Sequence, residues 1–95
     1  MTMTGTIDKV AVPEIAPTFR FQWEEAQDCY VILYPEGMVK LSSSAGEIMQ
    51  RINSQNSIQA IIDSLLEAFP GADLEDDVVK FLEVAYGNGW IRNKK

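Results

Sequence analysis

The residues of this chain whose types suit chemistry are a single thiol and a group of carboxylates. Cys29 is the only cysteine, and the sequence contains no histidine. These counts exclude an internal disulfide, a Cys/His zinc cluster and an imidazole general base. Cys29 is followed by the apolar run from Tyr30 to Ile32 and has no cationic neighbour that would favour the thiolate. We therefore predict a buried thiol that packs as a small hydrophobic group.

The carboxylates gather in one short segment that contains Asp73, Glu75, Asp76 and Asp77. Such oxygen ligands suit Ca²⁺, but an EF-hand needs regularly spaced ligands and a central glycine, which this segment lacks. Acidic residues also favour the first turn of a helix, and we interpret the cluster in this way. Without a nucleophile and base, a catalytic carboxylate pair or a metal site, the sequence predicts a protein that is not an enzyme and binds no cofactor or metal.

Length and charge narrow the function further. The 95 residues suffice for one compact domain. Fourteen acidic against eight basic side chains give a net charge of −6, which would repel the phosphates of a nucleic acid. No segment approaches the roughly 20 apolar residues that span a bilayer, and the first residues lack the pattern of a secretion signal. We expect a cytoplasmic protein with no nucleic-acid or membrane partner.

The residues that could carry function must be positioned by a small sheet, which the first half of the chain predicts. Aromatic residues alternate with polar ones over residues 18–23, which is the period of a strand with one wet face. Residues 29–34 form an aromatic and β-branched run typical of a central strand. A turn at Tyr34-Pro35-Glu36-Gly37 connects this run to residues 38–41. Together these segments predict a three-stranded antiparallel meander.

Three helices are predicted to follow the sheet. A capping box at Ser44-Ala45-Gly46-Glu47 opens the first, and a second box at Asn56-Ser57-Ile58-Gln59 opens a helix that stops at Pro70-Gly71. The third runs from about residue 74 to 86 and ends at Gly87-Asn88-Gly89. The predicted fold class is α+β, winged helix-turn-helix-like, with a three-stranded antiparallel sheet followed by three helices.

These patterns divide the chain into three parts. Residues 1–17 are expected to form an extended N-terminal arm, because two prolines forbid a continuous helix. Residues 18–91 form the domain, and the polar residues 92–95 are expected to form a disordered tail. In a DNA-binding winged helix the last helix enters the groove, but the acidic helix predicted here would meet the phosphates with the wrong sign.

The third helix has an apolar arc that is wider than one packing partner needs. Val84 lies on one side of the core stripe, and Val79 and Tyr86 lie on the other. Two interpretations stay open: the excess lines a binding groove, or it is covered by the domain itself or by the N-terminal arm. The core stripe comprises Leu74, Val78, Phe81, Leu82 and Ala85.

The last strand of the meander is a second candidate for binding. This strand, Met38-Val39-Lys40-Leu41, has one free edge, and only Lys40 discourages pairing there. A free edge is a template on which another strand can pair. We predict that an extended peptide adds alongside this strand and lies against the third helix. The helix residues predicted to contact the peptide are Asp77, Lys80, Phe81 and Val84.

Several short motifs, considered in order and spacing, resemble one known family over residues 17–91. They are Tyr34-Pro35-Glu36-Gly37, Val39, Leu41, Ala45, Ile48, the helix from Ile61 to Leu65, Val78, Phe81, Leu82 and Gly89-Trp90-Ile91. The family is PqqD, which acts in the biosynthesis of pyrroloquinoline quinone (PQQ). The motifs are mostly structural, so the resemblance rests on no catalytic signature.

The resemblance implies a peptide-recognition domain that acts as a peptide chaperone. In the PqqD family the bound peptide is the precursor PqqA. The complex engages PqqE, a radical S-adenosylmethionine enzyme that crosslinks a glutamate and a tyrosine of the precursor, so the iron–sulfur chemistry would belong to that enzyme. The family's peptide contacts lie on the third strand and third helix, which match Gly37 to Leu41 and Leu74 to Tyr86 here.

One position departs from the family's pattern, and one alternative function stays open. Asn53-Ser54 stands where the family has Asp-Gly after the first helix. Asparagine tolerates the left-handed conformation and serine can bond its own backbone, so the geometry of this turn is open.

The alternative function is a winged-helix adaptor that binds a different protein or a second copy of itself. We expect a monomer or a weak homodimer in dilute solution.

Overall fold

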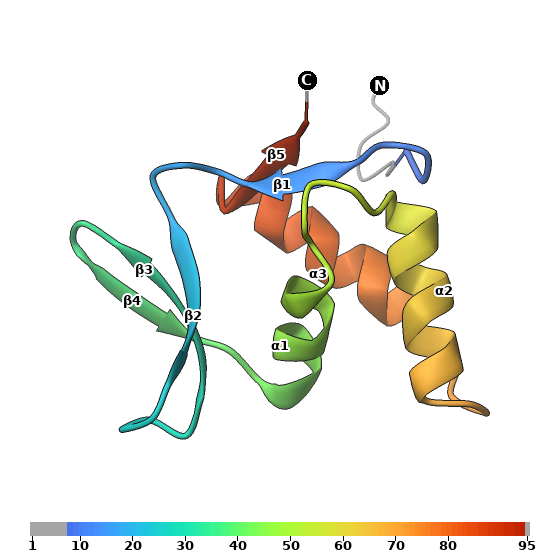
Figure 1. Ribbon diagram of the computed structural model, residues 1–95, viewed down its shortest axis with the longest axis horizontal. Coiled ribbons are helices and arrows are strands. Elements are labelled where there is room, and N and C mark those ends of the chain that lie inside the picture. Colours follow the sequence, from blue (N-terminus) through green and yellow to red (C-terminus); the bar gives the residue numbers. More distant parts are fainter. Residues whose placement is uncertain (1–7, 95) are drawn as a thin grey trace.

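The computed structural model describes residues 8–94, which form two small sheets and three helices (Figure 1). The first sheet has the antiparallel order β2-β3-β4, and β1 pairs with β5 in the second. The α+β class and the order of three strands before three helices are confirmed, whereas the β1–β5 pair was not predicted. In chain order the elements are β1 (Pro13–Ile15), β2 (Arg20–Glu24), β3 (Cys29–Tyr34), β4 (Gly37–Lys40), α1 (Ser43–Gln50), α2 (Ile58–Ala68), α3 (Glu75–Gly87) and β5 (Ile91–Asn93).

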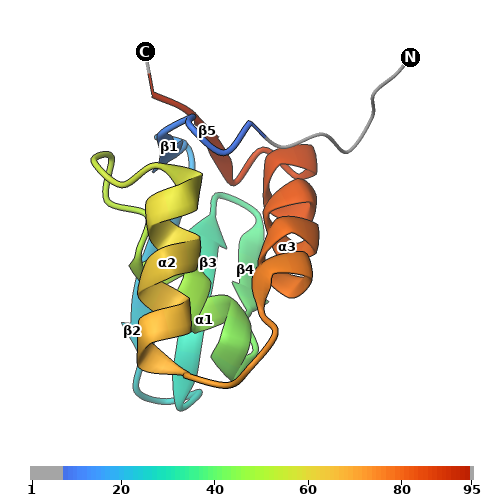
Figure 2. The same cartoon turned by 90° about the vertical axis from the view of Figure 1, so that its right-hand side faces the viewer.

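The three helices lie on one side of the β2-β3-β4 sheet (Figure 2), with α1 next to β3 and α2 beyond α1 (Figure 1). Ile32 of β3 lies directly opposite Val39 of β4, and directly opposed side chains in an antiparallel pair share a face. Ile32 is buried in the core, and Val39 packs against its edge. The hydrophobic core therefore lies between this face and the helices. Its buried members are Ile32, Leu41, Ala45, Ile48, Met49, Ile52, Ile58, Ile61, Ile62, Leu65, Val78, Leu82, Ala85 and Ile91.

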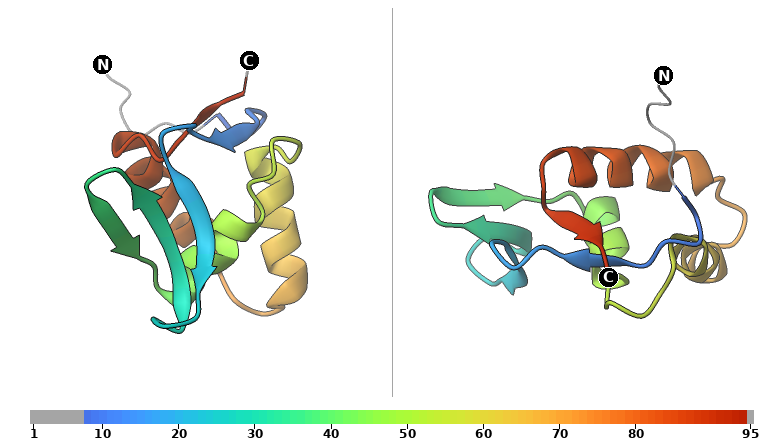
Figure 3. Two further views of the ribbon diagram at one scale, coloured as in Figure 1. Left: turned by 60° about the vertical axis from the view of Figure 1, so that its left-hand side comes forward. Right: turned by 90° about the horizontal axis from the view of Figure 1, so that it is seen from above.

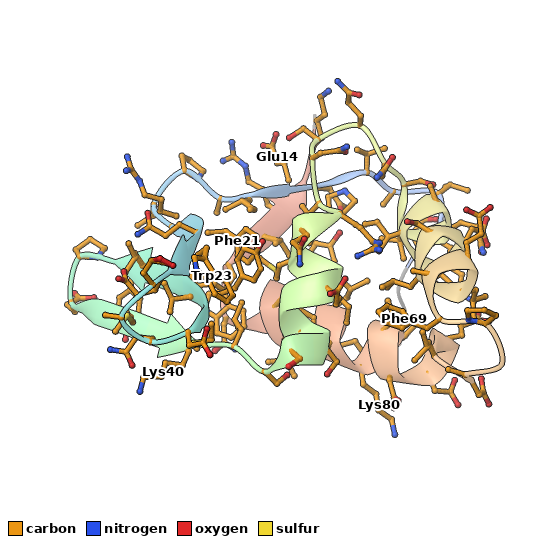
Figure 4. The ribbon with its side chains drawn as sticks, turned by 60° about the horizontal axis from the view of Figure 1, so that its bottom comes forward. Glu14, Phe21, Trp23, Lys40, Phe69 and Lys80 are labelled. Carbon is orange, nitrogen blue, oxygen red and sulfur yellow. The ribbon has the colours of Figure 1, made fainter. Side chains whose placement is uncertain are left out.

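Aromatic residues of β2 and β3 fill the space between the sheet and α1. Phe21 stacks on Tyr30 with ring centroids 4.7 Å apart, and Trp23 meets the same ring edge-on at 5.1 Å. In Figure 4, Phe21 and Trp23 lie between the strands and α1. A Cβ atom at Gly46 would lie 3.1 Å from the Tyr30 ring, so glycine allows α1 to approach the sheet closely here.

The first two helices are capped by serines that differ from the N-cap residues that the capping boxes predict. The Ser42 hydroxyl accepts from the Ala45 amide at 3.2 Å, so Ser42, not Ser44, is the N-cap of α1. The Ser57 hydroxyl likewise caps α2. Asn56 was predicted for this role, but its side-chain amide donates to a carbonyl at the end of α1 and is thus used to close the connecting turn.

The two chain ends, predicted as an extended arm and a disordered tail, pair with each other as strands β1 and β5. Glu14 of β1 lies opposite Arg92 of β5, and their side chains form an ion pair at 2.7 Å. The Lys94 amide donates to the Val12 carbonyl at 2.7 Å, so the pairing continues beyond β5. Residues 92 and 93 are therefore in a strand. A strand of three residues is too short to show an alternating pattern. It forms here because it pairs with a strand at the other end of the chain, which the local sequence does not reveal.

The N-terminal arm also caps α2. The amides of Ile58 and Gln59 donate to the carbonyls of Ala11 and Lys9, each at 2.9 Å. The first amides of a helix have no partner within the helix, so an external acceptor satisfies them. The Lys9 side chain pairs with Glu75 at the start of α3. The arm thus connects β5, α2 and α3.

The turn after α1 uses Asn53 and Ser54 in roles opposite to those considered from sequence. Ser54 adopts the left-handed conformation, with φ at 66°. The Asn53 side-chain oxygen accepts from the amides of Gln55 and Asn56 at 3.0 and 2.9 Å. The asparagine therefore holds the turn by hydrogen bonds, and the serine has the backbone conformation that favours glycine.

We expect Ser54→Gly to raise the free energy of unfolding by up to about 1 kcal/mol, because it removes the left-handed strain of a residue that bears a Cβ. Ser54 contributes its carbonyl, which accepts from Lys94, and this bond survives the substitution. Thermal or urea denaturation measures the change. Gln55→Gly, one residue further on and without positive φ, is the control and should lower stability. Equal losses for the two variants would contradict the account.

Candidate functional site

The outer edge of β4 carries main-chain groups that are free to pair with another strand. The Leu41 amide donates to the Tyr30 carbonyl at 3.0 Å, which marks Leu41 and Tyr30 as a hydrogen-bonded pair. Such pairs alternate along an antiparallel ladder, so Val39 also bonds to β3. Met38 and Lys40 between them direct their amides and carbonyls outward. Because β4 ends the order β2-β3-β4, no strand within residues 8–94 occupies that edge.

The predicted contacts on α3 form a stripe along the helix. Asp77, Phe81 and Val84 follow one another at spacings of four and three residues, which places them on one face. Phe81 is half-buried, and the centroid of its ring lies 6.3 Å from that of the Trp90 ring. Asp77 and Val84 lie on either side of Phe81 and are exposed, and 52% of the Val84 surface is accessible to solvent. Lys80 is an exposed neighbour of this stripe.

The β4 edge and α3 lie on the same side of the molecule. In Figure 2, β4 lies between β3 and α3, so its free edge is turned toward the side on which α3 stands. The view from above in Figure 3 agrees, because β4 and α3 both run along one side there. Figure 4 places Lys40 and Lys80 along a common side as well. The fold thus brings together two elements that are far apart in sequence.

The individual side chains of the predicted site differ in exposure. Gly37, Met38 and Lys40 are exposed, and Val39 is half-buried against the core. Leu41 follows β4 and is buried in the core, because its pairing with Tyr30 turns it toward the helices. Its side chain is therefore remote from the open edge. The peptide-binding role of these five residues stays a prediction.

The two sides of the wide apolar arc on α3 differ in how far they are covered. Val79 and Tyr86 are half-buried against the core, so the domain itself covers that side. The Tyr86 hydroxyl donates to the Asn93 side chain of β5 at 2.5 Å. Burial raises the pKa of Tyr86, and the nearby Asp8 carboxylate raises it further, so the phenol stays protonated and keeps this bond. Val84, on the other side, is left uncovered.

A pocket of about 400 Å³ opens beside the Asp77 end of the stripe, where the three helices meet. We call it the three-helix pocket. Asp77 and Phe81 line it, whereas Lys80, Val84 and β4 do not. The sequence does not predict this pocket, because its wall combines residues of three separate helices. The lining residues are Ser42, Ser43, Ser44, Ala45, Glu47, Ile48, Leu65, Phe69, Leu74, Asp77, Val78 and Phe81.

The described residues include no candidate metal site, and Cys29 lies at the end of the sheet. Within residues 8–94, no three His, Cys, Asp or Glu side chains gather closely enough to hold a metal ion. Cys29 is half-buried, not buried as predicted, because it is the first residue of β3 and stands opposite Glu24 at the end of the sheet. None of the three helices in the described part of the chain is long and apolar enough to span a bilayer.

Comparison with known proteins assigns the fold and the family. The model of the family Coenzyme PQQ synthesis protein D (PqqD) matches residues 29–91, which is more than half of the chain. The chain belongs to the PqqD family. The matched residues begin at β3 and include β4 and α3, so both halves of the candidate site lie within the part that identifies the PqqD family.

Curated PqqD relatives match most of the chain. A PqqA binding protein from Azotobacter vinelandii is 52% identical over 81 residues, which cover 84% of this chain and 88% of the relative. A PqqA binding protein from Methylococcus capsulatus is 46% identical over 79 residues, which cover 83% and 85%. The family resemblance inferred from the motifs is therefore confirmed.

A solved PqqD structure has the same fold. The solution structure of the PqqD truncation of Methylobacterium extorquens PqqCD superposes with a TM-score of 0.75 at 18% identity. It covers 93% of this chain and 96% of that one. That protein is described as a functional, stand-alone recognition element for ribosomally synthesised and post-translationally modified peptides.

Proposed function

We propose that this protein is a non-catalytic peptide chaperone of PQQ biosynthesis that binds the precursor PqqA and presents it to the radical S-adenosylmethionine enzyme PqqE. The peptide adds as a strand to the outer edge of β4 and lies against the Asp77-Phe81-Val84 stripe of α3. The crosslinking chemistry and its iron–sulfur cluster belong to the enzyme. The proposed place of action is the cytoplasm, where a newly made precursor is available.

The observation that carries this proposal is the open β4 edge on the same side as an uncovered apolar position of α3. Met38 and Lys40 offer outward amides and carbonyls, which give a peptide main-chain bonds independent of its side chains. Phe81 and Val84 offer apolar surface on which peptide side chains pack. The names of the curated relatives, which describe PqqA binding, support the identity of the peptide.

Lys40→Pro tests the strand-addition step. Proline removes the outward amide of Lys40, whereas Val39→Pro would remove a bond to β3 and damage the sheet itself. We expect Lys40→Pro to weaken PqqA binding about tenfold, through a lost hydrogen bond and restricted backbone. Lys40→Ala retains the amide and is the matched control for the charge. Titration calorimetry measures both, and equal affinities for the two variants would refute strand addition.

Val84→Glu tests the helix side of the site. Val84 is half exposed, so the substitution leaves the core intact, but peptide binding would bury an unpaired carboxylate. We expect the dissociation constant for PqqA to rise at least about tenfold, which corresponds to about 1.4 kcal/mol. Val10→Glu makes the same chemical change at an exposed valine of the arm and should bind as the parent does. Amide shifts confined to residues 57–69 on addition of PqqA would relocate the site.

A third measurement separates presentation to PqqE from peptide binding alone. Crosslink formation by PqqE should increase when the parent protein is added and should increase less with the same concentration of Lys40→Pro. If PqqA binds but the protein leaves the PqqE reaction unchanged, the protein is an adaptor for a different partner.

Sedimentation over a range of concentrations tests the proposed monomer or weak homodimer, and a tight dimer at nanomolar concentration would argue against it.

A further inference from the structure

The three-helix pocket extends beyond the path of the proposed strand addition. Its wall is predominantly apolar and includes Leu65, Phe69, Leu74 and Val78. Phe69, just after α2, is 41% exposed, although aromatic side chains gain more than most from burial. A volume of about 400 Å³ lies near the lower end of the range for ligand pockets, about 300–1,000 Å³. The pocket thus has room for a large side chain, but not for a folded partner.

The pocket is continuous with the proposed peptide path. The chain passes from Lys40, the last residue of β4, through Leu41 to Ser42, which lines the pocket. Asp77 and Phe81 belong both to the α3 stripe and to the pocket wall. A peptide that pairs with β4 and extends past Lys40 therefore reaches the pocket mouth without leaving α3. Figure 4 shows Phe69 between the ends of α2 and α3, beyond Lys80 on the side away from Lys40.

The charge at the pocket mouth indicates which kind of peptide residue would bind there. Asp77 is exposed at the rim and has no ion-pair partner among residues 8–94. Glu47 also lines the pocket, but it is paired with Arg51 at 2.9 Å. The chain carries a net charge of −6, so the surrounding field favours a cation at this position.

We propose that the three-helix pocket holds an apolar side chain of the bound precursor peptide, flanked by a lysine or arginine of the peptide that pairs with Asp77. This inference rests on the proposed function, because it takes strand addition on β4 as the peptide's path. The pocket fixes the register of the peptide. Main-chain bonds to an edge strand are the same for every residue, so β4 alone leaves the peptide free to shift along it.

Paired substitutions test the pocket with synthetic PqqA as the probe. Phe69→Ala should weaken binding about tenfold, because the apolar contact is lost. Leu66→Ala is the matched control, since Leu66 is similarly exposed at 38% and close in sequence but does not line the pocket. Asp77→Asn should weaken binding and reduce its dependence on salt. Asp76→Asn removes an adjacent exposed carboxylate outside the pocket and should do neither.

An alanine scan of PqqA identifies the occupant. Replacement of one apolar PqqA residue by alanine should weaken binding to the parent protein. The same peptide change should weaken binding to Phe69→Ala little further, because the two substitutions remove the same contact. Thermal melting of each variant confirms that it is folded. Nuclear Overhauser effects between the Phe69 ring and peptide methyl groups provide a direct readout.

The outcomes separate this inference from the proposed function. No binding of PqqA to the parent protein would refute both. Weakening by Lys40→Pro together with parental affinity in Phe69→Ala and Asp77→Asn would refute the pocket alone. Equal weakening by Phe69→Ala and Leu66→Ala would also refute it, because the effect would belong to the surface in general. If Phe69→Ala abolishes self-association and leaves PqqA binding unchanged, a second copy occupies the pocket and the inference is wrong.

Discussion

Leu82→Ala should lower the free energy of unfolding by about 3–5 kcal/mol, at the upper end of the range for buried leucines. Leu82 is 0% exposed and lies in the middle of α3, where it contributes to the core between the helices and the sheet. Its removal deletes apolar contacts and leaves a cavity that surrounding helices fill only in part. For a domain of this size, each kcal/mol lowers the melting temperature by about 4–8 °C, so the shift should exceed 10 °C.

Val84→Ala is the matched control, because it shortens an apolar side chain two residues along the same helix. Val84 is largely exposed, so this variant should lie within about 0.5 kcal/mol of the parent. Urea denaturation with a common slope measures both. Similar losses for the two variants would mean that α3 is held by helix propensity and not by the core. The stability of α3 also underlies the candidate site, since one face of this helix is buried and another lies beside β4.

Deletion of residues 1–16 should cost about 3–5 kcal/mol, although the arm lies at the chain end. The deletion removes the carbonyls of Lys9 and Ala11, which accept from the first amides of α2. It also removes β1 together with its buried Pro13, so the packing that Pro13 provides is lost and β5 loses its partner. The lost acceptors cost about 1 kcal/mol each, and the lost burial and pairing supply the rest.

Lys9→Ala separates the backbone role of the arm from its surface charge. It removes the exposed ion pair with Glu75 but keeps the Lys9 carbonyl, so the loss should stay below about 1 kcal/mol. A synthetic peptide of residues 1–16, added to the truncated protein, should restore part of the lost stability. A truncated protein that melts like the parent would show that β5 and α2 need no cap from the arm.

The truncation also bears on the interpretation of peptide binding. The arm pairs with β5 and not with β4, so it leaves the outer β4 edge open within residues 8–94. Weaker PqqA binding after truncation would therefore reflect lost stability, not a lost contact. Measurement at a temperature well below the melting point of the truncated protein removes this ambiguity.

The sequence by itself determined the elements that position the candidate site. The alternation over residues 18–23 sets which face of β2 is apolar, since side chains alternate faces with a period of two, and the turn at 34–37 sets the register of β3 and β4. The open edge of β4 follows from the same pattern, because β4 ends the meander. Helical spacing alone predicts that Leu82 and Ala85 lie in the core, and both are buried. Each of these inferences depends on residues close together in the chain.

Only the tertiary structure decided which parts of these elements are covered. The wheel of α3 places Val84 and Tyr86 outside the core stripe, but it cannot show that Tyr86 meets β5 while Val84 remains exposed. The β1–β5 pair joins the two ends of the chain, and the three-helix pocket combines residues from α1, α2 and α3. Contacts between distant segments depend on the packing of the whole core, whereas local periodicity reports only which face of each element is apolar.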